Sequence, residues 1–349
     1  MFQSRIPRFS FRAGTVGFGL LSAAIFGLAL VIGIAGLGFG RIWDELASVR
    51  FGLIAIVLVH IGQLAFCAWA WSCLMSDVQA GRRPGFLELL GLRWTRESID
   101  SLLPVAQVGG ELAAARLLAG TRLSIPVAGA SIIADVTIET LTQAVFTLIG
   151  LALLFGLAKG GDVAHWAELG LAIAAAFAAL AVFAQRWGGV RLFEKLLLAI
   201  ADRTGWNRLE GVAGLDAALS EVYRLRGQLL LAGLGHLAAW SLGAAEVMVA
   251  SWALGYPLDA GQGYVVESLA QAVRSAAFFV PAAVGIQEGS FVIVAGLFGV
   301  PPDAAVSISL TKRVRELALG LPGLAAWQMR EIRRRLTRRS AAATAAADP

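Results

Sequence analysis

Charged side chains inside the longest apolar stretches are the residues of this sequence best suited to chemistry. Asp135 and Glu139 lie four positions apart in one stretch, and Lys312 and Glu316 repeat that spacing in the last one. Residues four apart share one face of a helix, so each pair presents its charges in one direction. Charges at membrane depth are costly and usually mark a substrate or ion pathway. Together the two signs suit a charged or hydroxylated headgroup, and the carboxylates could also carry protons.

A single offset links these two regions. Pro104 and Glu111 precede the first pair, and Pro281 and Glu288 precede the second. Pro281 follows Pro104 by 177 positions, and Glu288 follows Glu111 by the same number (288 − 111 = 177). Glu316 also follows Glu139 by 177 positions. We therefore predict an internal repeat, with units at about 86–157 and 264–327.

The composition excludes an ordinary soluble domain. The 349 residues are 58% hydrophobic and only 15% charged, and the mean hydropathy is +0.73. The formal charge of +5 does not indicate nucleic-acid binding, because the basic residues flank apolar spans, where they set topology and contact anionic headgroups. We predict an all-α integral membrane protein. Its expected full crossings, about six, are 13–39, 51–75, 124–157, 166–183, 229–254 and 302–327.

Two further segments are broken, and the first of them is amphipathic and too charged to face lipid. One begins near Phe86 and is interrupted at Pro104, and the other begins near Tyr264 and is interrupted at Pro281. Broken backbone at membrane depth is tolerated where protein or a water-filled cavity covers it, as in a re-entrant helical hairpin. If both hairpins return to their own side, the basic loop 186–228 lies in the cytoplasm, as positive-inside statistics favour.

This topology has a consequence for the repeat. An odd number of crossings separates the two hairpins, so the two units enter the membrane from opposite sides. Inverted repeats with discontinuous helices are typical of transporters that open alternately to either face. We expect one polytopic domain over 1–329, an amphipathic cytoplasmic insert at about 186–228 and a basic, disordered cytoplasmic tail over 330–349. The N-terminus is expected in the cytoplasm as well.

If the two hairpins meet, their charges and those of the long helices line one polar cavity. We expect Glu111, Glu288, Arg315 and Glu316 at its centre. The full predicted substrate-binding set is Glu111, Glu288, Arg315, Glu316, Lys312, Arg313, Asp135, Glu139, Arg96 and Arg274. The opposing interpretation is that these charges only neutralise one another, which would make their burial tolerable. Glu246 is either a cavity wall residue or the buried partner of a neighbouring helix.

Enzymatic chemistry finds little support in the sequence. His60, His165 and His236 are far apart and show no metal-ligand spacing, and no phosphate-binding glycine loop occurs. Cys67 and Cys73 lie in one predicted span and are expected to be packed thiols. We therefore expect no cofactor, no metal and no catalytic residue. The partners we expect are membrane lipids, with anionic lipid at the basic loop and tail. The sequence leaves open whether the protein forms a homo-oligomer.

Three motifs carry a family resemblance. They are 103–111, 280–289 and 310–316, and they resemble the flippase-like transmembrane domain shared with lysylphosphatidylglycerol synthases. Within that superfamily the chain is most similar to hopanoid-biosynthesis-associated membrane proteins of Gram-negative bacteria. The resemblance implies an inner-membrane protein that moves or sorts lipids, either hopanoids or anionic and aminoacylated phospholipids. The chain lacks the soluble aminoacyl-transferase domain of the bifunctional members, so aminoacyl transfer is not implied.

Two other functions stay open at this level. The first is a lipid-binding scaffold that recruits lipid or hopanoid synthesis enzymes through the basic loop and tail. The second is a membrane-embedded lipid-modifying enzyme that uses buried carboxylates as acid and base. A transporter, a scaffold and an enzyme would differ in which variants lose function: those of the cavity or those of the tail.

Overall fold

A computed structural model describes residues 50–75, 83–103, 109–119, 123, 125–157, 215–276, 283 and 285–347. Within these ranges every regular element is an α-helix, as predicted. The helices are α3 (Arg50–Cys73), α4 (Phe86–Leu102), α5 (Gly109–Ala119), α6 (Ile125–Leu157), α9 (Leu215–Arg224), α10 (Arg226–Ala253), α11 (Ala260–Ala276), α12 (Ile286–Gly296) and α13 (Pro302–Ala347). The expected crossings 13–39 and 166–183, most of the insert 186–228, Pro104 and Pro281 lie outside the described residues.

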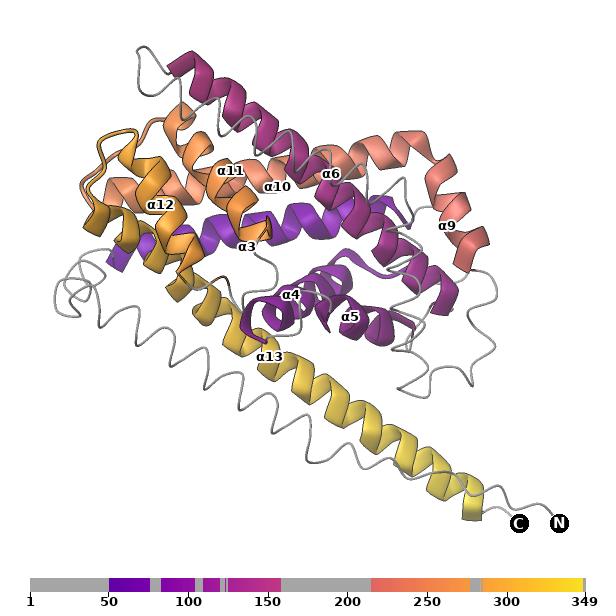
Figure 1. The fold of residues 1–349 in the computed structure, drawn as a ribbon. Helices are drawn as coiled ribbons and strands as arrows, with labels where there is room; N and C mark the ends of the chain where they lie inside the picture. Colours follow the sequence, from indigo (N-terminus) through magenta and orange to yellow (C-terminus); the bar gives the residue numbers. More distant parts are fainter. Residues whose placement is uncertain are drawn as a thin grey trace.

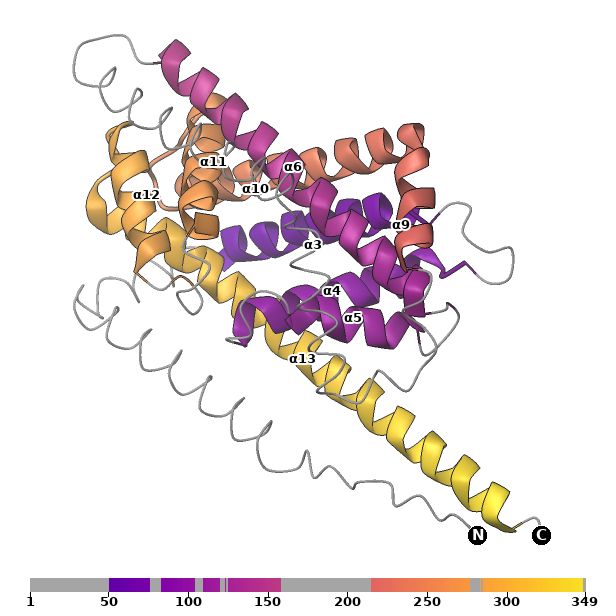
Figure 2. The same cartoon turned by 45° about the vertical axis from the view of Figure 1, so that its right-hand side comes forward.

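Three of the described helices are long and apolar enough to cross a membrane. They are α3, α6 and α10, which match the predicted crossings at 51–75, 124–157 and 229–254 to within a few residues. Leu58, Leu148 and Leu234 on these helices are exposed, as side chains that face lipid must be. In both ribbon views α3 and α10 run side by side while α6 crosses α10 (Figures 1 and 2).

Two helix pairs, α4 with α5 and α11 with α12, correspond to the predicted broken segments. The second helix of each pair begins with an acidic residue in its first turn, Glu111 in α5 and Glu288 in α12. Glu288 accepts a hydrogen bond of 2.7 Å from the Gly285 N–H, and Asp100 of α4 accepts one of 2.8 Å from Gly110. Carboxylates at a helix N-terminus satisfy its free N–H groups and its dipole. Each broken element thus has a carboxylate at the N-terminus of its second helix, although Asp100 and Glu288 are not equivalent positions of the repeat.

Helix α13 is much longer than the predicted last crossing. It continues through the tail that the sequence analysis expects to be disordered and ends at Ala347. The tail is rich in Ala and Arg, which are strong helix formers, so it can extend a helix that has already begun. Gly320 and Gly323 let α13 approach α4 closely, because a Cβ at either position would collide with Leu102 or Ser98.

The core consists of separate apolar clusters with a polar region between them. Along α3, Ile56 belongs to a cluster formed with α10, α11, α12 and α13, whereas Trp71 belongs to a second cluster formed with α4, α5 and α6. His60, Gln63 and Cys67 fall between these two positions. The apolar packing therefore holds the helices at both ends and leaves their middle parts to polar side chains.

Candidate functional site

A polar cavity of about 300 Å³ lies where the middle parts of these helices meet. Residues of α3, α4, α5, α6, α10, α11 and α13 line it, and Gln63, Thr140 and Trp240 lie close to the centres of α3, α6 and α10. Because these three helices are long enough to cross a membrane, their shared central level corresponds to the middle of the bilayer. Polar groups from these helices therefore gather at that depth.

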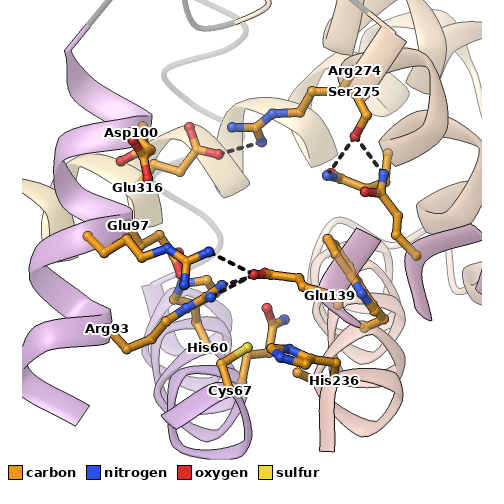
Figure 3. Close-up of a pocket in the computed structure, with 18 of the residues that line it drawn as sticks. His60, Cys67, Arg93, Glu97, Asp100, Glu139, His236, Arg274, Ser275 and Glu316 are labelled. Atoms are coloured by element: carbon orange, nitrogen blue, oxygen red, sulfur yellow. Dashed lines mark hydrogen bonds and ion pairs between the residues drawn. The ribbon is translucent and has the colours of Figure 1, made fainter. Parts of the chain in front are cut away.

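One arginine organises the cavity wall on the α4 and α6 side. The Arg96 guanidinium donates to Glu111 at 3.0 Å, to Asp135 at 2.5 Å and to Glu139 at 3.0 Å. Arg93, one helical turn earlier on α4, holds Glu139 with two bonds of 2.8 and 2.6 Å (Figure 3). Paired, hydrogen-bonded geometry of this kind is what allows buried charges to persist.

The opposite wall, formed by α11 and α13, has a similar arginine arrangement. Glu316 of α13 accepts a hydrogen bond of 2.8 Å from Arg274 of α11 (Figure 3). It accepts a second one, of 3.2 Å, from Arg313. Arg313 also donates to Glu288 at 3.2 Å. One turn earlier, Lys312 donates to Glu267 of α11 at 2.5 Å. These bonds connect α11, α12 and α13 into one charged unit.

His60 on α3 connects the two walls. Its Nδ1 lies 2.8 Å from a carboxylate oxygen of Glu246 on α10, and its Nε2 lies 2.6 Å from one of Glu97 on α4. Arg315 of α13 donates to Glu246 at 3.1 Å, and Gln63 donates to the same carboxylate at 2.8 Å. Glu246 is fully buried and does not line the cavity, so it takes the role of a buried partner.

Five buried side-chain atoms in the described residues have no hydrogen-bond partner, and all five belong to residues that line this cavity. Three are N–H donors, on Arg93 Nε, Arg315 Nε and Trp240 Nε1. The other two are Glu111 Oε2 and His236 Nδ1. Buried polar atoms are almost always paired, because an unpaired one costs about 1–3 kcal/mol. Their concentration here indicates a surface built to contact something polar.

The predicted site residues fall into two groups. Those that line the cavity are Arg96, Glu111, Glu139, Arg274, Lys312, Arg315 and Glu316. Asp135, Glu288 and Arg313 do not line it, and they contact lining residues or a helix end instead. The interpretation that the charges neutralise one another describes much of the ion pairing, but it does not account for the unpaired atoms.

Several lining residues were not predicted as site residues, among them His60, Cys67, His236 and Trp240. They lie on α3 and α10, which carry no counterpart of the repeated motifs. The available signal was a polar residue near the centre of an otherwise apolar span, as at His60, Gln63 and His236.

Comparisons with known proteins identify the family. Searches of curated proteins and of solved structures found no match to this chain. The sequence profile described as "Lysylphosphatidylglycerol synthase TM region" matches residues 19–323. This range includes both helix pairs and every residue that lines the cavity. The chain is therefore a membrane protein that belongs to the lysylphosphatidylglycerol synthase TM region family.

Proposed function

We propose that this protein is a flippase-like transporter whose central cavity takes the headgroup of a membrane lipid, and that it is not an enzyme. Its family ties the chain to membrane lipids. The observation that carries the proposal is the set of unpaired buried atoms in the cavity wall. Charges that only neutralised one another would give no reason for donors and acceptors without a protein partner to gather in one cavity wall.

The chemistry of these atoms indicates what the cavity takes. The free N–H groups of Arg93, Arg315 and Trp240 match the oxygens of a phosphate or a hydroxyl-rich headgroup. The free Oε2 of Glu111 matches an ammonium or hydroxyl group. An anionic or aminoacylated phospholipid offers both kinds of partner, and a hopanoid with a hydroxylated side chain offers the hydroxyls.

The architecture we propose completes this role. It has six full crossings and two re-entrant hairpins, α4–α5 and α11–α12, that form an inverted repeat in the bacterial inner membrane with both termini in the cytoplasm. The proposal is supported by the pairing of each broken element with one long helix, α4 with α6 through Glu139 and α11 with α13 through Glu316. Two such units on opposite walls would open the cavity to one leaflet and then to the other.

Transport can be tested with a variant that fills the cavity without removing a charge. Thr140 lines the cavity and is exposed, so Thr140→Phe should narrow it with little cost to folding. The neighbouring Leu141 is exposed but does not line the cavity, which makes Leu141→Phe a matched control. In liposomes that contain a fluorescent phospholipid, we expect transfer between leaflets with wild type and the control, and a severalfold slower transfer with Thr140→Phe.

The opposite results would have different meanings. Equal rates for Thr140→Phe and wild type would remove the cavity from the transport route. No transfer by wild type, with either a phospholipid or a hopanoid as probe, would contradict transport itself. Native mass spectrometry of the gently purified protein then gives a separate readout of binding. A lipid retained by Leu141→Phe and lost by Thr140→Phe, without transfer, would favour the lipid-binding scaffold.

A further inference from the structure

Three potential metal ligands meet at the floor of the cavity, each from a different helix. They are the Cys67 thiol of α3, the Glu139 carboxylate of α6 and the His236 imidazole of α10, and their ligand atoms lie within 4.8 Å of one another. In Figure 3 the Cys67 sulfur lies beside the His236 ring. Sulfur, nitrogen and oxygen donors in one group are the set that Zn²⁺ and similar transition metal ions bind.

His236 is already oriented as a ligand. It is only 1% exposed, and its Nε2 lies 3.0 Å from Oδ1 of Asp135, a fully buried carboxylate. A neutral imidazole that donates from Nε2 has its lone pair on Nδ1. That atom is buried and has no hydrogen-bond partner. Metal-binding histidines characteristically donate their other ring nitrogen to a carboxylate in this way, which fixes the tautomer and the ring.

We propose that Cys67, His236 and Glu139 form a binding site for a divalent transition metal ion such as Zn²⁺, with Asp135 as the residue that orients His236. Binding would deprotonate the thiol, and its proton would leave to solvent. The ligands would be the Cys67 thiolate, His236 Nδ1 and one oxygen of Glu139. This site is independent of whether the cavity carries a lipid.

Glu139 has capacity left for an ion. Its Oε2 accepts from both Arg93 and Arg96, but its Oε1 accepts only from Arg93 Nη2, at 2.6 Å. A carboxylate oxygen has two lone pairs, so Oε1 keeps one for a metal. A tetrahedral ion with bonds of about 2.0–2.3 Å separates its ligands by about 3.5 Å. The three side chains therefore need to close by little more than about 1 Å.

The charges around the site also favour a divalent cation. The ion-paired groups on this wall are Arg93 and Arg96 against Glu111, Asp135 and Glu139, which leaves one excess negative charge. A Cys67 thiolate adds a second, and a divalent ion neutralises both. Protonation of His236 would remove the first charge without a metal. The acceptor nearest to its Nδ1–H would then be the Cys67 sulfur, a weak acceptor.

The same geometry leaves one position of the ion open. Three protein ligands occupy three corners of a tetrahedron, and Cys67, Glu139 and His236 all line the cavity. The fourth corner would face the cavity, where water or an anionic oxygen could bind. The sequence analysis expects Cys67 to be a packed thiol and the chain to hold no metal. Spacing alone hides this site, because its ligands are 72 and 97 positions apart, as 139 − 67 and 236 − 139 give.

Cobalt(II) provides a direct test, because a thiolate ligand gives Co²⁺ a charge-transfer absorption that other ligands do not. The protein has only two cysteines, both buried on α3, and Cys73 does not line the cavity. With purified full-length protein we expect wild type and Cys73→Ser to bind one equivalent of Co²⁺ with this absorption, displaced by Zn²⁺. Cys67→Ser should lose it. Absorption that is missing in wild type, or unchanged in Cys67→Ser, would overturn the proposal.

A second measurement uses a protein whose site is intact. In Cys73→Ser the Cys67 thiol is the single thiol of the chain, so its alkylation by a maleimide reports on that residue alone. We expect Zn²⁺ to slow alkylation at least tenfold, and Mg²⁺ to have no effect because it avoids sulfur ligands. Adding His236→Asn should abolish the protection. Equal protection by both ions, or protection that survives His236→Asn, would contradict a metal site at these residues.

Discussion

The two walls of the cavity use the same positions with opposite charges. Asp135 on α6 and Lys312 on α13 occupy equivalent places at the 177-residue offset, and both are buried. Each contacts a side chain of α10: His236 lies 3.0 Å from Asp135, and Glu246 lies 3.9 Å from Lys312. Each long helix thus meets α10 through a pair of ionisable side chains, and the acidic member lies on the long helix in one wall and on α10 in the other.

One helical turn later, the equivalent positions of the two walls carry the same charge. Glu139 and Glu316 are both carboxylates, and each is held by arginine from the first helix of a broken element, α4 or α11. The comparison separates two roles. The glutamate and arginine pairs attach each broken element to its long helix, whereas the positions facing α10 give the two walls different chemistry. The variants below test this difference.

The largest effect should come from the arginine that serves most partners. Arg96 contacts three carboxylates, of which Glu111 and Asp135 are buried. Arg274 contacts Glu316 and Gln287, and Glu316 keeps Arg313 as a second partner. Arg96→Met should lower the free energy of unfolding by about 3–5 kcal/mol, because it leaves Glu111 unpaired and removes one partner each from Asp135 and Glu139. Arg274→Met should cost about half as much. Denaturant unfolding in mixed micelles measures both, and equal losses would mean that the walls are equivalent.

A smaller loss of unfolding free energy is expected at Lys312, because its partner Glu267 can be made neutral by a second substitution. Lys312→Met leaves Glu246 and Glu267 without their lysine and should cost about 2–3 kcal/mol, since Arg315 still holds Glu246. Adding Glu267→Gln should recover about 1–2 kcal/mol of this loss. The same unfolding experiment completes the double-mutant cycle. Strictly additive losses would show that the short contact between Lys312 and Glu267 contributes nothing.

The smallest effect should be at the helix ends. Glu288→Gln keeps an oxygen that can accept from the Gly285 N–H and loses only its charge beside Arg313, so we expect a cost of about 1 kcal/mol. Because Glu288 does not line the cavity, lipid transfer in liposomes should stay at the wild-type rate. Loss of transfer in a well-folded Glu288→Gln protein would return this residue to the centre of the site, where the sequence analysis puts it.

The sequence was sufficient for the class of fold and for three of its long helices. Apolar runs of more than 20 residues have few alternatives in a membrane, so 51–75, 124–157 and 229–254 could be read directly. The end of α13 could not, because an Ala- and Arg-rich segment is compatible with both a disordered tail and the continuation of an existing helix.

The site was predicted less completely, because the sequence does not show where each side chain points or which helix it contacts. A four-residue spacing put Asp135 and Glu139 on one face, but only Glu139 reaches the cavity, since Asp135 is enclosed by Arg96 and His236. Cys67 was interpreted as a packed thiol and His60 was left out of the predicted site, because a polar atom in a span gives no sign of whether its partner is another helix or a cavity. That distinction depends on how the helices pack, which the repeated motifs do not encode.

Helix α13 has a mechanical consequence. Its 46 residues measure about 69 Å at a rise of 1.5 Å each, more than twice the hydrocarbon thickness of a bilayer. One half carries Lys312, Arg315 and Glu316, and the other extends well beyond the rest of the bundle (Figure 1). Pro322 lies between the two halves. Close to it, the Trp94 indole N–H of α4 donates a hydrogen bond of 2.9 Å to the Leu319 carbonyl. Because α4 contacts α13 from Leu319 to Arg330, a force on the far end of the helix would reach one wall of the cavity through this contact.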